Sequence, residues 1–147
     1  MSASAGHARS RFRIPVRVYY QDTDAGGVVF HGQYLSFFER ARTELLNAAG
    51  VDLARLADDR RVLFLVFELS IRYHRPARLN DLLSVTADVI KIGGASVVFR
   101  QRVERDAQCL VEADVTVATV HRDTMRPVRI PQEVAQQLAQ ELERALQ

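Results

Sequence analysis

The sequence is poor in cysteine and histidine, and it has no long hydrophobic run. Cys109 is the single cysteine among 147 residues, so no disulfide can form within the chain, which favours a reducing, cytoplasmic setting. The four histidines lie far apart, and no cysteine–histidine group has metal-ligand spacing. We therefore expect no metal site and no bound cofactor. No apolar run approaches the roughly 20 residues that a transmembrane helix needs.

A strong charge of one sign is also missing. Twenty Lys and Arg against 18 Asp and Glu leave a formal net charge of +2. This is too small to indicate a nucleic-acid partner, but it suits an anionic small molecule. The length and the 48% hydrophobic content are typical of one globular domain. Residues 1–13 have no apolar segment, which argues against a secretory signal. We expect them to form a disordered lead-in to a domain over 14–147.

The hydrophobic pattern predicts an α+β fold. Alternation over 14–20 predicts a strand, and apolar residues at three- and four-residue steps predict a long helix over 32–49. Four strand-like runs follow, at 62–73, 82–90, 95–104 and 109–121. A helical stripe then begins near Pro131. Short connections predict antiparallel neighbours, so we expect about five strands curled around the long helix, with exposed strand faces meeting a partner subunit.

The most distinctive stretch lies between the first predicted strand and the long helix. Residues 19–31 read YYQDTDAGGVVFH, with two aspartates, two glycines that permit a tight turn, and a histidine where the helix should begin. The first N–H groups of a helix have no partner within it and carry partial positive charge, so they can stabilise an oxyanion. A carboxylate beside them could attack a carbonyl or activate a water. The arrangement indicates acyl transfer or hydrolysis.

Each of these residues also has a structural interpretation. Asp22 and Asp24 could form turns or cap the helix, as aspartate often does. We favour Asp24 as the catalytic carboxylate and loop support for Asp22. His31 could contact substrate, carry a proton, or only start the helix. Tyr20 and Tyr34 are expected to be packing residues rather than acids or bases.

Residues 18–31, together with 34–44 and 73–81, closely resemble the hotdog-fold acyl-CoA thioesterases of the 4-hydroxybenzoyl-CoA thioesterase type. The likeness covers roughly residues 14–125 and is nearest to the branch associated with the bacterial Tol-Pal envelope system. The resemblance implies a hotdog fold, in which a sheet wraps around one long helix. It also implies sites at a dimer interface, with dimers often paired into tetramers.

The resemblance also implies roles for individual residues. It places the catalytic aspartate, as nucleophile or general base, at Asp24, and the backbone N–H that polarises the thioester carbonyl at His31. Histidine at that position points to short-chain or general acyl-CoA rather than an aromatic substrate. Further candidates for substrate contact are Gly27, Tyr20, Phe67 with its neighbour Glu68, and the cations Lys91, Arg75 and Arg100.

The expected activity is therefore hydrolysis of an acyl-CoA to a free acid and CoA by a homodimer or homotetramer, without metal or cofactor. Acyl carrier protein is an alternative carrier of the acyl group. Two other functions stay open on the same fold. One is a non-catalytic module that binds acyl-CoA or acyl carrier protein. The other is a hydratase, which would need an acid and a histidine on the central helix.

Overall fold

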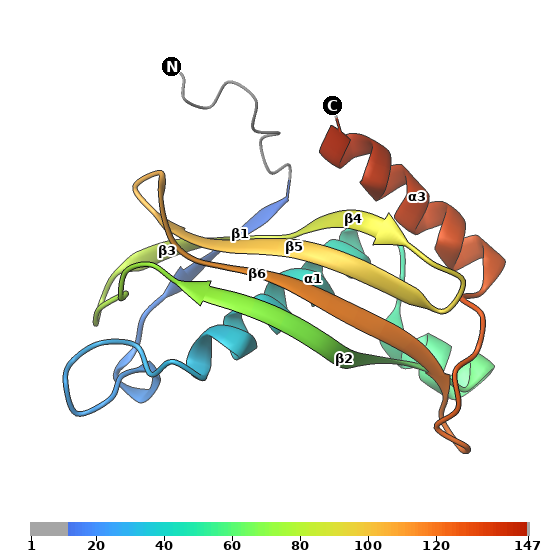
Figure 1. Cartoon of the computed structure of the whole chain (residues 1–147). Helices are drawn as coiled ribbons and strands as arrows, with labels where there is room; N and C mark the ends of the chain where they lie inside the picture. The colour runs from blue at the N-terminus through green and yellow to red at the C-terminus, as the bar shows by residue number, and fades with distance from the viewer. Residues whose placement is uncertain (1–11, 147) are drawn as a thin grey trace.

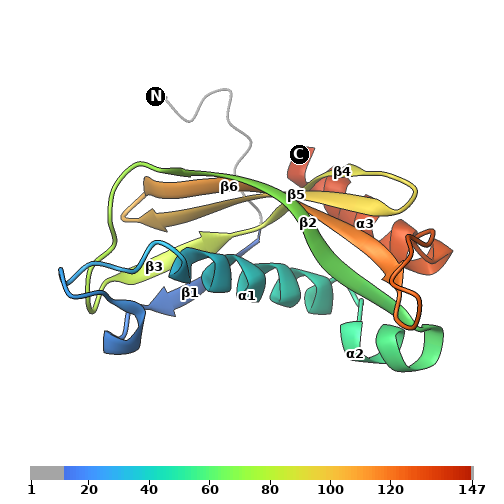
Figure 2. The ribbon, with the colours of Figure 1, turned by 60° about the horizontal axis from the view of Figure 1, so that its bottom comes forward.

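Six antiparallel strands form one curved sheet in the computed structural model, which describes residues 12–146. The strands are β1 (Arg13–Arg17), β2 (Val62–Tyr73), β3 (Leu82–Thr86), β4 (Asp88–Ile92), β5 (Ser96–Arg105) and β6 (Gln108–His121). They lie in the order β1–β3–β5–β6–β2, and β4 also pairs with β5. The long helix α1 (Gln33–Ala48) runs along the inner face of this sheet (Figures 1 and 2). The predicted α+β hotdog fold is confirmed.

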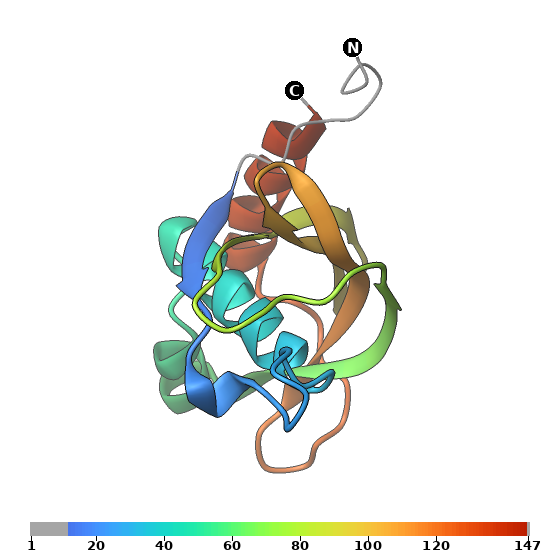
Figure 3. The same ribbon diagram turned by 90° about the vertical axis from the view of Figure 1, so that its left-hand side faces the viewer.

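The remaining helices lie at the ends of the sheet. Helix α3 (Gln132–Leu146) packs against β4 (Figure 1). The connection from α1 to β2 holds the short α2 (Leu53–Arg55) and the π-helical turn η2 (Leu56–Arg60), and a 3₁₀ turn, η1 (Tyr20–Asp22), follows β1. Viewed end-on, the sheet curls around α1 from β1 on one side to β2 on the other (Figure 3). In the described part of the chain, no helix is long and apolar enough to cross a membrane.

The core forms where α1 meets the sheet. Five buried positions of α1 follow the three- and four-residue spacing: Tyr34, Phe37, Phe38, Ala41 and Leu45. Arg42 and Leu46 are buried outside that stripe, and Ala48, which belongs to it, is exposed. Phe37 and Phe38 are completely buried. They join inward-facing residues of the two central strands: Val97, Phe99 and Val103 of β5, and Val111, Ala113 and Val115 of β6. Burying a phenylalanine side chain contributes about 1.5–3 kcal/mol to stability. This packing fixes the position of the α1 N-terminus relative to the loop before it.

The sheet has six strands rather than the expected five or so, because the predicted strand over 82–90 is divided into β3 and β4. It breaks at Ala87, a buried residue whose N–H donates to the Phe12 carbonyl. The part before the break, β3, pairs with β1 and with the end of β5, whereas β4 pairs with the start of β5. The alternation of apolar residues continues through the break, so the pattern alone could not reveal it.

The predicted neighbour order is also wrong at one connection. The 74–81 segment does not join two adjacent strands, since β2 pairs with β6 and forms the edge of the sheet opposite β1. The segment instead crosses the end of the sheet and is held by backbone hydrogen bonds from His74 and Arg75 to the Leu110 carbonyl. This crossing brings the 74–81 segment beside the loop that precedes α1.

The beginning of the chain departs slightly from expectation. The predicted lead-in falls mostly on residues 1–11, which lie outside the described part. Arg13 already belongs to β1, where its guanidinium donates to the Ser84 hydroxyl and pairs with Glu104. Strand β1 ends at Arg17 rather than residue 20, because the chain then turns into η1.

Candidate active site

The segment between β1 and α1 folds back on itself as a short hairpin. The Asp24 N–H donates to the Val28 carbonyl at 2.8 Å, and the Gly27 N–H donates to the Asp24 carbonyl at 3.1 Å. Gly27 has a φ of +81°, a left-handed conformation that glycine adopts without strain. These features make a tight three-residue hairpin loop. Of the two glycines, Gly27 is the one that this turn requires, and Asp24 stands at the start of the turn.

Asp22 holds this hairpin to the helix. It is only 3% exposed, and its carboxylate accepts hydrogen bonds from the Tyr19 N–H at 2.8 Å and from the Gln33 side chain at 3.0 Å. Its backbone carbonyl accepts the Phe30 N–H. The prediction of loop support for Asp22 is confirmed. Since the carboxylate is buried and its two oxygens each have a partner, it is unsuited to attack a substrate.

Asp24 has a different environment, although it is only two residues away. Its side chain is exposed, and Oδ1 accepts a hydrogen bond from the Gly26 N–H at 2.8 Å. This is the turn-forming contact that the structural interpretation expects. Within residues 12–146, Oδ2 has no hydrogen-bond partner. One oxygen thus fixes the side chain, and the other is left to meet a substrate or a water.

The N-terminal end of α1 lies directly after the hairpin. Helix α1 begins at Gln33, with Gly32 as its N-cap, and the His31 backbone N–H has no acceptor within residues 12–146. The His31 ring is exposed and lies against Phe30, with ring centroids 4.4 Å apart. An added Cβ at Gly32 would come within 2.8 Å of the Phe30 ring. Gly32 therefore lets Phe30 lie close to the backbone here.

Two tyrosines support the helix start from the other side. The Tyr73 hydroxyl, at the end of β2, donates to the His31 carbonyl at 2.9 Å. The Tyr34 hydroxyl accepts the Ala77 N–H at 3.0 Å, and the rings of Tyr34 and Tyr73 meet edge to face with centroids 5.7 Å apart. Burial raises the pKa of Tyr34, so its hydroxyl stays neutral. The prediction that Tyr34 is a packing residue is confirmed.

A pocket of about 280 Å³ opens between α1 and the β2 edge. Its apolar lining comes from both elements and from β6, and Ser36, Glu39 and Arg42 add polar groups. The apolar residues are Leu35, Phe38, Val66, Leu69 and Val115. Leu35 and Ser36 belong to the first turn of α1, so the pocket begins close to the His31 end of the helix. Phe67 and Glu68, which the sequence suggests as pocket-shaping residues, do not line it.

One chain does not bring all the predicted contact residues to the Asp24 loop. Tyr20 is 81% exposed, so its predicted packing role is wrong in the single chain, and Phe67 is 69% exposed at a bulge in β2. Lys91 lies on β4, at the opposite end of the molecule from the Asp24 loop (Figures 1 and 2). Arg75 is exposed and lies two residues after Tyr73, whose hydroxyl contacts the helix start.

Sequence reasoning does not select Tyr73 or Gln33 for this region. The signals for Tyr73 are its place on the inward face of β2 and its membership of the 73–81 stretch that carries the family resemblance, and the signal for Gln33 is its position at the start of the helix. Both contacts depend on chain segments that are distant in sequence.

A family model described as the thioesterase superfamily matches residues 26–112, more than half of the chain. The chain belongs to the thioesterase superfamily. The matched region includes α1, the strands β2 to β5 and the first residues of β6, and it begins two residues after Asp24.

Curated relatives of this thioesterase extend the likeness over most of the chain. It is 47% identical over 123 residues to a Haemophilus influenzae protein named acyl-CoA thioesterase YbgC, covering 84% of this chain and 90% of the relative. It is 42% identical to the Escherichia coli acyl-CoA thioester hydrolase YbgC, covering 88% and 96%. A crystal structure of the hypothetical protein TT1821 from Thermus thermophilus superposes with a TM-score of 0.83 at 30% identity, covering 89% and 99%.

Proposed function

We propose that this thioesterase hydrolyses acyl-CoA to a free acid and CoA, with Asp24 as the catalytic carboxylate and the His31 N–H as a donor to the thioester oxygen. The observation that carries the assignment is the free Oδ2 of Asp24, in the hairpin that leads directly into a helix start whose His31 N–H has no protein acceptor in residues 12–146. The names of the relatives at 42–47% identity support acyl-CoA as the substrate class.

The chemistry requires charge to develop on the thioester oxygen. A backbone N–H at the helix start can donate to that oxygen, and the partial positive charge of the helix terminus adds to the effect. Removing one such donor in other enzymes costs about 10²–10³ in kcat. The Tyr73 hydroxyl holds the His31 carbonyl, so it helps to fix the orientation of the backbone around this donor.

The acyl group would enter the pocket between α1 and β2. The apolar walls from Leu35, Val66 and Leu69 suit an alkyl chain. Helix α1 contains no histidine over 33–48, so it lacks the acid–histidine pair that a hydratase of this fold would need on the central helix. A short-chain or general acyl-CoA remains our proposal for the substrate, with acyl carrier protein as the alternative carrier.

We propose further that the enzyme works as a homodimer joined along β2. This strand is the edge of the sheet, and it exposes five large apolar side chains: Leu65, Val66, Phe67, Leu69 and Tyr73. A long exposed apolar edge strand is a surface for pairing with another chain. Pairing there would cover the open side of the pocket and could bring the partner's cations to the CoA. A tetramer, membership of the Tol-Pal branch and a cytoplasmic location stay predictions.

The substitution Phe67→Lys is expected to weaken the dimer by about 30-fold or more, since a buried aromatic anchor at an interface is worth about 2 kcal/mol. Light scattering after gel filtration over a concentration series measures the change. The matched control is Leu82→Lys, at a residue 54% exposed on β3, which β1 and β5 flank on both sides. A Phe67→Lys protein that keeps the wild-type assembly would contradict pairing along β2.

Thiol release from short, long and aromatic acyl-CoAs, and from the matching acyl-carrier-protein esters, tests the reaction. We expect turnover on at least one CoA ester. Acyl-CoA recovered unchanged after long incubation with the protein would contradict hydrolysis and would favour a binding module.

A single turnover in H₂¹⁸O can identify nucleophilic attack by Asp24. If Asp24 activates a water, the acid from the first turnover contains ¹⁸O. If Asp24 attacks the thioester and water then cleaves the anhydride at the Asp24 carbonyl, the first acid carries an unlabelled oxygen and the label enters Asp24.

A further inference from the structure

The outer face of the sheet holds a second cluster of reactive side chains, which a bulge in β6 creates. Val103 of β5 pairs with Val111, and Glu104 pairs with Cys109, so Leu110 has no partner in β5. A bulge of this kind shifts the alternation of side chains along the strand. Leu110 and Val111 are consequently both buried.

The bulge brings two metal-ligating residues together. Residues three apart on a regular strand point to opposite faces, but here the Cys109 Sγ lies 4.0 Å from Glu112 Oε2. The unpaired Leu110 offers its carbonyl to the N–H groups of His74 and Arg75, at 2.8 and 3.0 Å. These bonds hold the chain after β2 against the bulge and place His74 Nε2 3.7 Å from Glu112 Oε1.

We propose that His74, Cys109 and Glu112 form a binding site for a borderline-soft divalent metal ion, of which Zn²⁺ fits best. The three ligand atoms all lie within 4.8 Å of one another. Zinc binds thiolate, imidazole and carboxylate at about 2.0–2.3 Å in tetrahedral geometry, which separates neighbouring ligand atoms by roughly 3.3–3.8 Å. The 3.7 Å and 4.0 Å separations are to the two different carboxylate oxygens of Glu112. Binding through one of these oxygens therefore requires side-chain rotations that close the ligand atoms from within 4.8 Å to about 3.5 Å.

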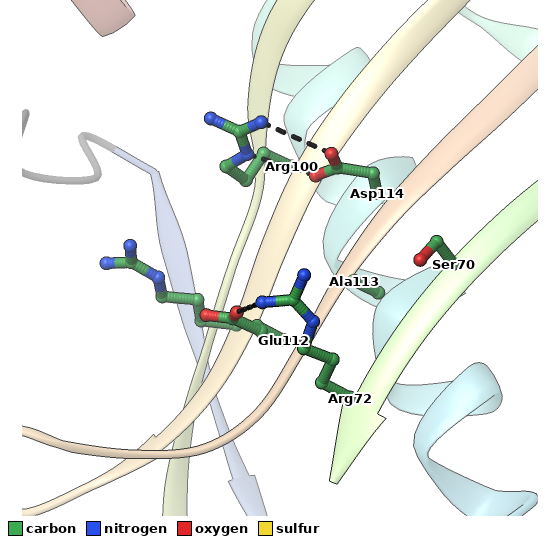
Figure 4. A pocket seen from close by; sticks show the side chains of 7 residues that line it. Ser70, Arg72, Arg100, Glu112, Ala113 and Asp114 are labelled. Atoms are coloured by element: carbon green, nitrogen blue, oxygen red, sulfur yellow. Dashed lines mark hydrogen bonds and ion pairs between the residues drawn. The ribbon is translucent and has the colours of Figure 1, made fainter. Parts of the chain in front are cut away.

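The three groups have no stronger partner to give up. The His74–Glu112 separation is too long for a hydrogen bond, and the Cys109 Sγ reaches the Val111 carbonyl only at 3.6 Å. Arg72 pairs with Glu112 at 3.5 Å, with 75% of the Arg72 side chain exposed (Figure 4). An exposed ion pair of that kind is worth about 0–1 kcal/mol. Metal coordination could therefore replace these contacts at little cost.

The neighbouring arginines shape what else the ion would bind. Arg72 and Arg102 line the charged pocket that Glu112 also lines. Figure 4 shows the Arg72 side chain directed toward Glu112. The positive charges of these arginines disfavour the approach of a cation, but the Cys109 thiolate and the Glu112 carboxylate supply two negative charges that neutralise Zn²⁺. With three protein ligands, a fourth position is open. The arginines favour a small anion or a hydroxide over neutral water in that position.

The site would also strengthen the end of β2. His74 directly follows Tyr73, whose hydroxyl donates to the His31 carbonyl at the helix start. A metal that ties His74 to β6 would restrict the edge strand near the candidate active site. We therefore expect Zn²⁺ to raise the thermal stability of the protein, by mass action on the folded state.

Titration of the full chain with Co²⁺, a spectroscopic substitute for Zn²⁺, tests the proposal directly. We expect one equivalent to produce the near-ultraviolet thiolate-to-cobalt charge-transfer band, and Zn²⁺ to abolish it by displacement. The band should be absent in Cys109→Ser. In His74→Gln and Glu112→Gln the metal Kd should rise by at least about a hundredfold, since even outer-shell changes cost 10–100-fold.

The control variant is His121→Gln, which removes a histidine from the same strand β6 but outside the cluster. It should bind cobalt as the wild type does. Zinc should raise Tm in the wild type and in His121→Gln, but not in Cys109→Ser, with circular dichroism confirming that every variant folds. A wild type without the charge-transfer band, or a band that persists in Cys109→Ser, would overturn the proposal.

Discussion

Asp24→Asn is expected to lower kcat for acyl-CoA hydrolysis by about 10²–10⁴-fold while leaving the fold intact. The asparagine side chain can still accept the Gly26 N–H, so the turn that positions residue 24 persists. Asparagine cannot, however, act as a base or as a carboxylate nucleophile. Because Asp24 is exposed and has one protein hydrogen bond, its charge contributes little to folding. Steady-state thiol release and a urea unfolding curve measure the two quantities separately.

The matched control is Asp22→Asn, in the same loop. Asp22 is buried, and one carboxylate oxygen accepts from Tyr19 and the other from Gln33. An amide would place its NH₂ group against one of these donors, which costs about 1–3 kcal/mol of stability. We expect this variant to be less stable, but to keep more activity per folded molecule than Asp24→Asn. Near wild-type turnover by Asp24→Asn would refute the catalytic assignment and leave the turn-forming interpretation.

The local elements of the fold could be predicted because their signals are local. The apolar steps over 32–49 match α1 at Gln33–Ala48, and the run over 62–73 matches β2. Strand order depends instead on contacts between distant segments. The 74–81 connection is short enough for a hairpin and yet crosses the end of the sheet, and only the pairing of β2 with β6 reveals this.

In the candidate site too, local features could be predicted from the sequence, whereas contacts between distant segments could not. The motif around Asp24 marks the turn and the helix start, since each depends on nearby residues. A β-bulge shifts the alternation of side chains, so the face on which a residue lies cannot be predicted from the sequence pattern beyond it. Phe67 is a predicted substrate contact, but a bulge between Val66 and Glu68 leaves it without a partner in β6. The bulge at Leu110 likewise gathers His74, Cys109 and Glu112, although their spacing in sequence suggests no metal site.

A further large effect is expected from Gln101→Leu, which should lower the free energy of unfolding by about 3–5 kcal/mol. Gln101 is a polar residue at an inward position of β5 and is completely buried. Its amide donates to the carbonyls of Phe38 and Thr86, and its oxygen accepts from Arg42 NH1 at 2.9 Å. This is the only hydrogen bond that the Arg42 guanidinium makes within residues 12–146. Leucine would leave a buried positive charge without an acceptor.

Burial already disfavours the charged form of Arg42 and lowers its pKa, with Glu39 acting in the opposite direction. Replacing both members of a buried polar pair with apolar residues is often neutral. The double variant Arg42→Met/Gln101→Leu should therefore recover at least half of the stability that Gln101→Leu loses. Urea unfolding of both single variants and the double variant gives the coupling energy.

Arg40→Met, at an exposed position of the same helix, is the control and should change stability by less than about 1 kcal/mol. If the double variant is no more stable than Gln101→Leu, the lost stability comes from the unpaired carbonyls of Phe38 and Thr86 and not from the unpaired Arg42 guanidinium.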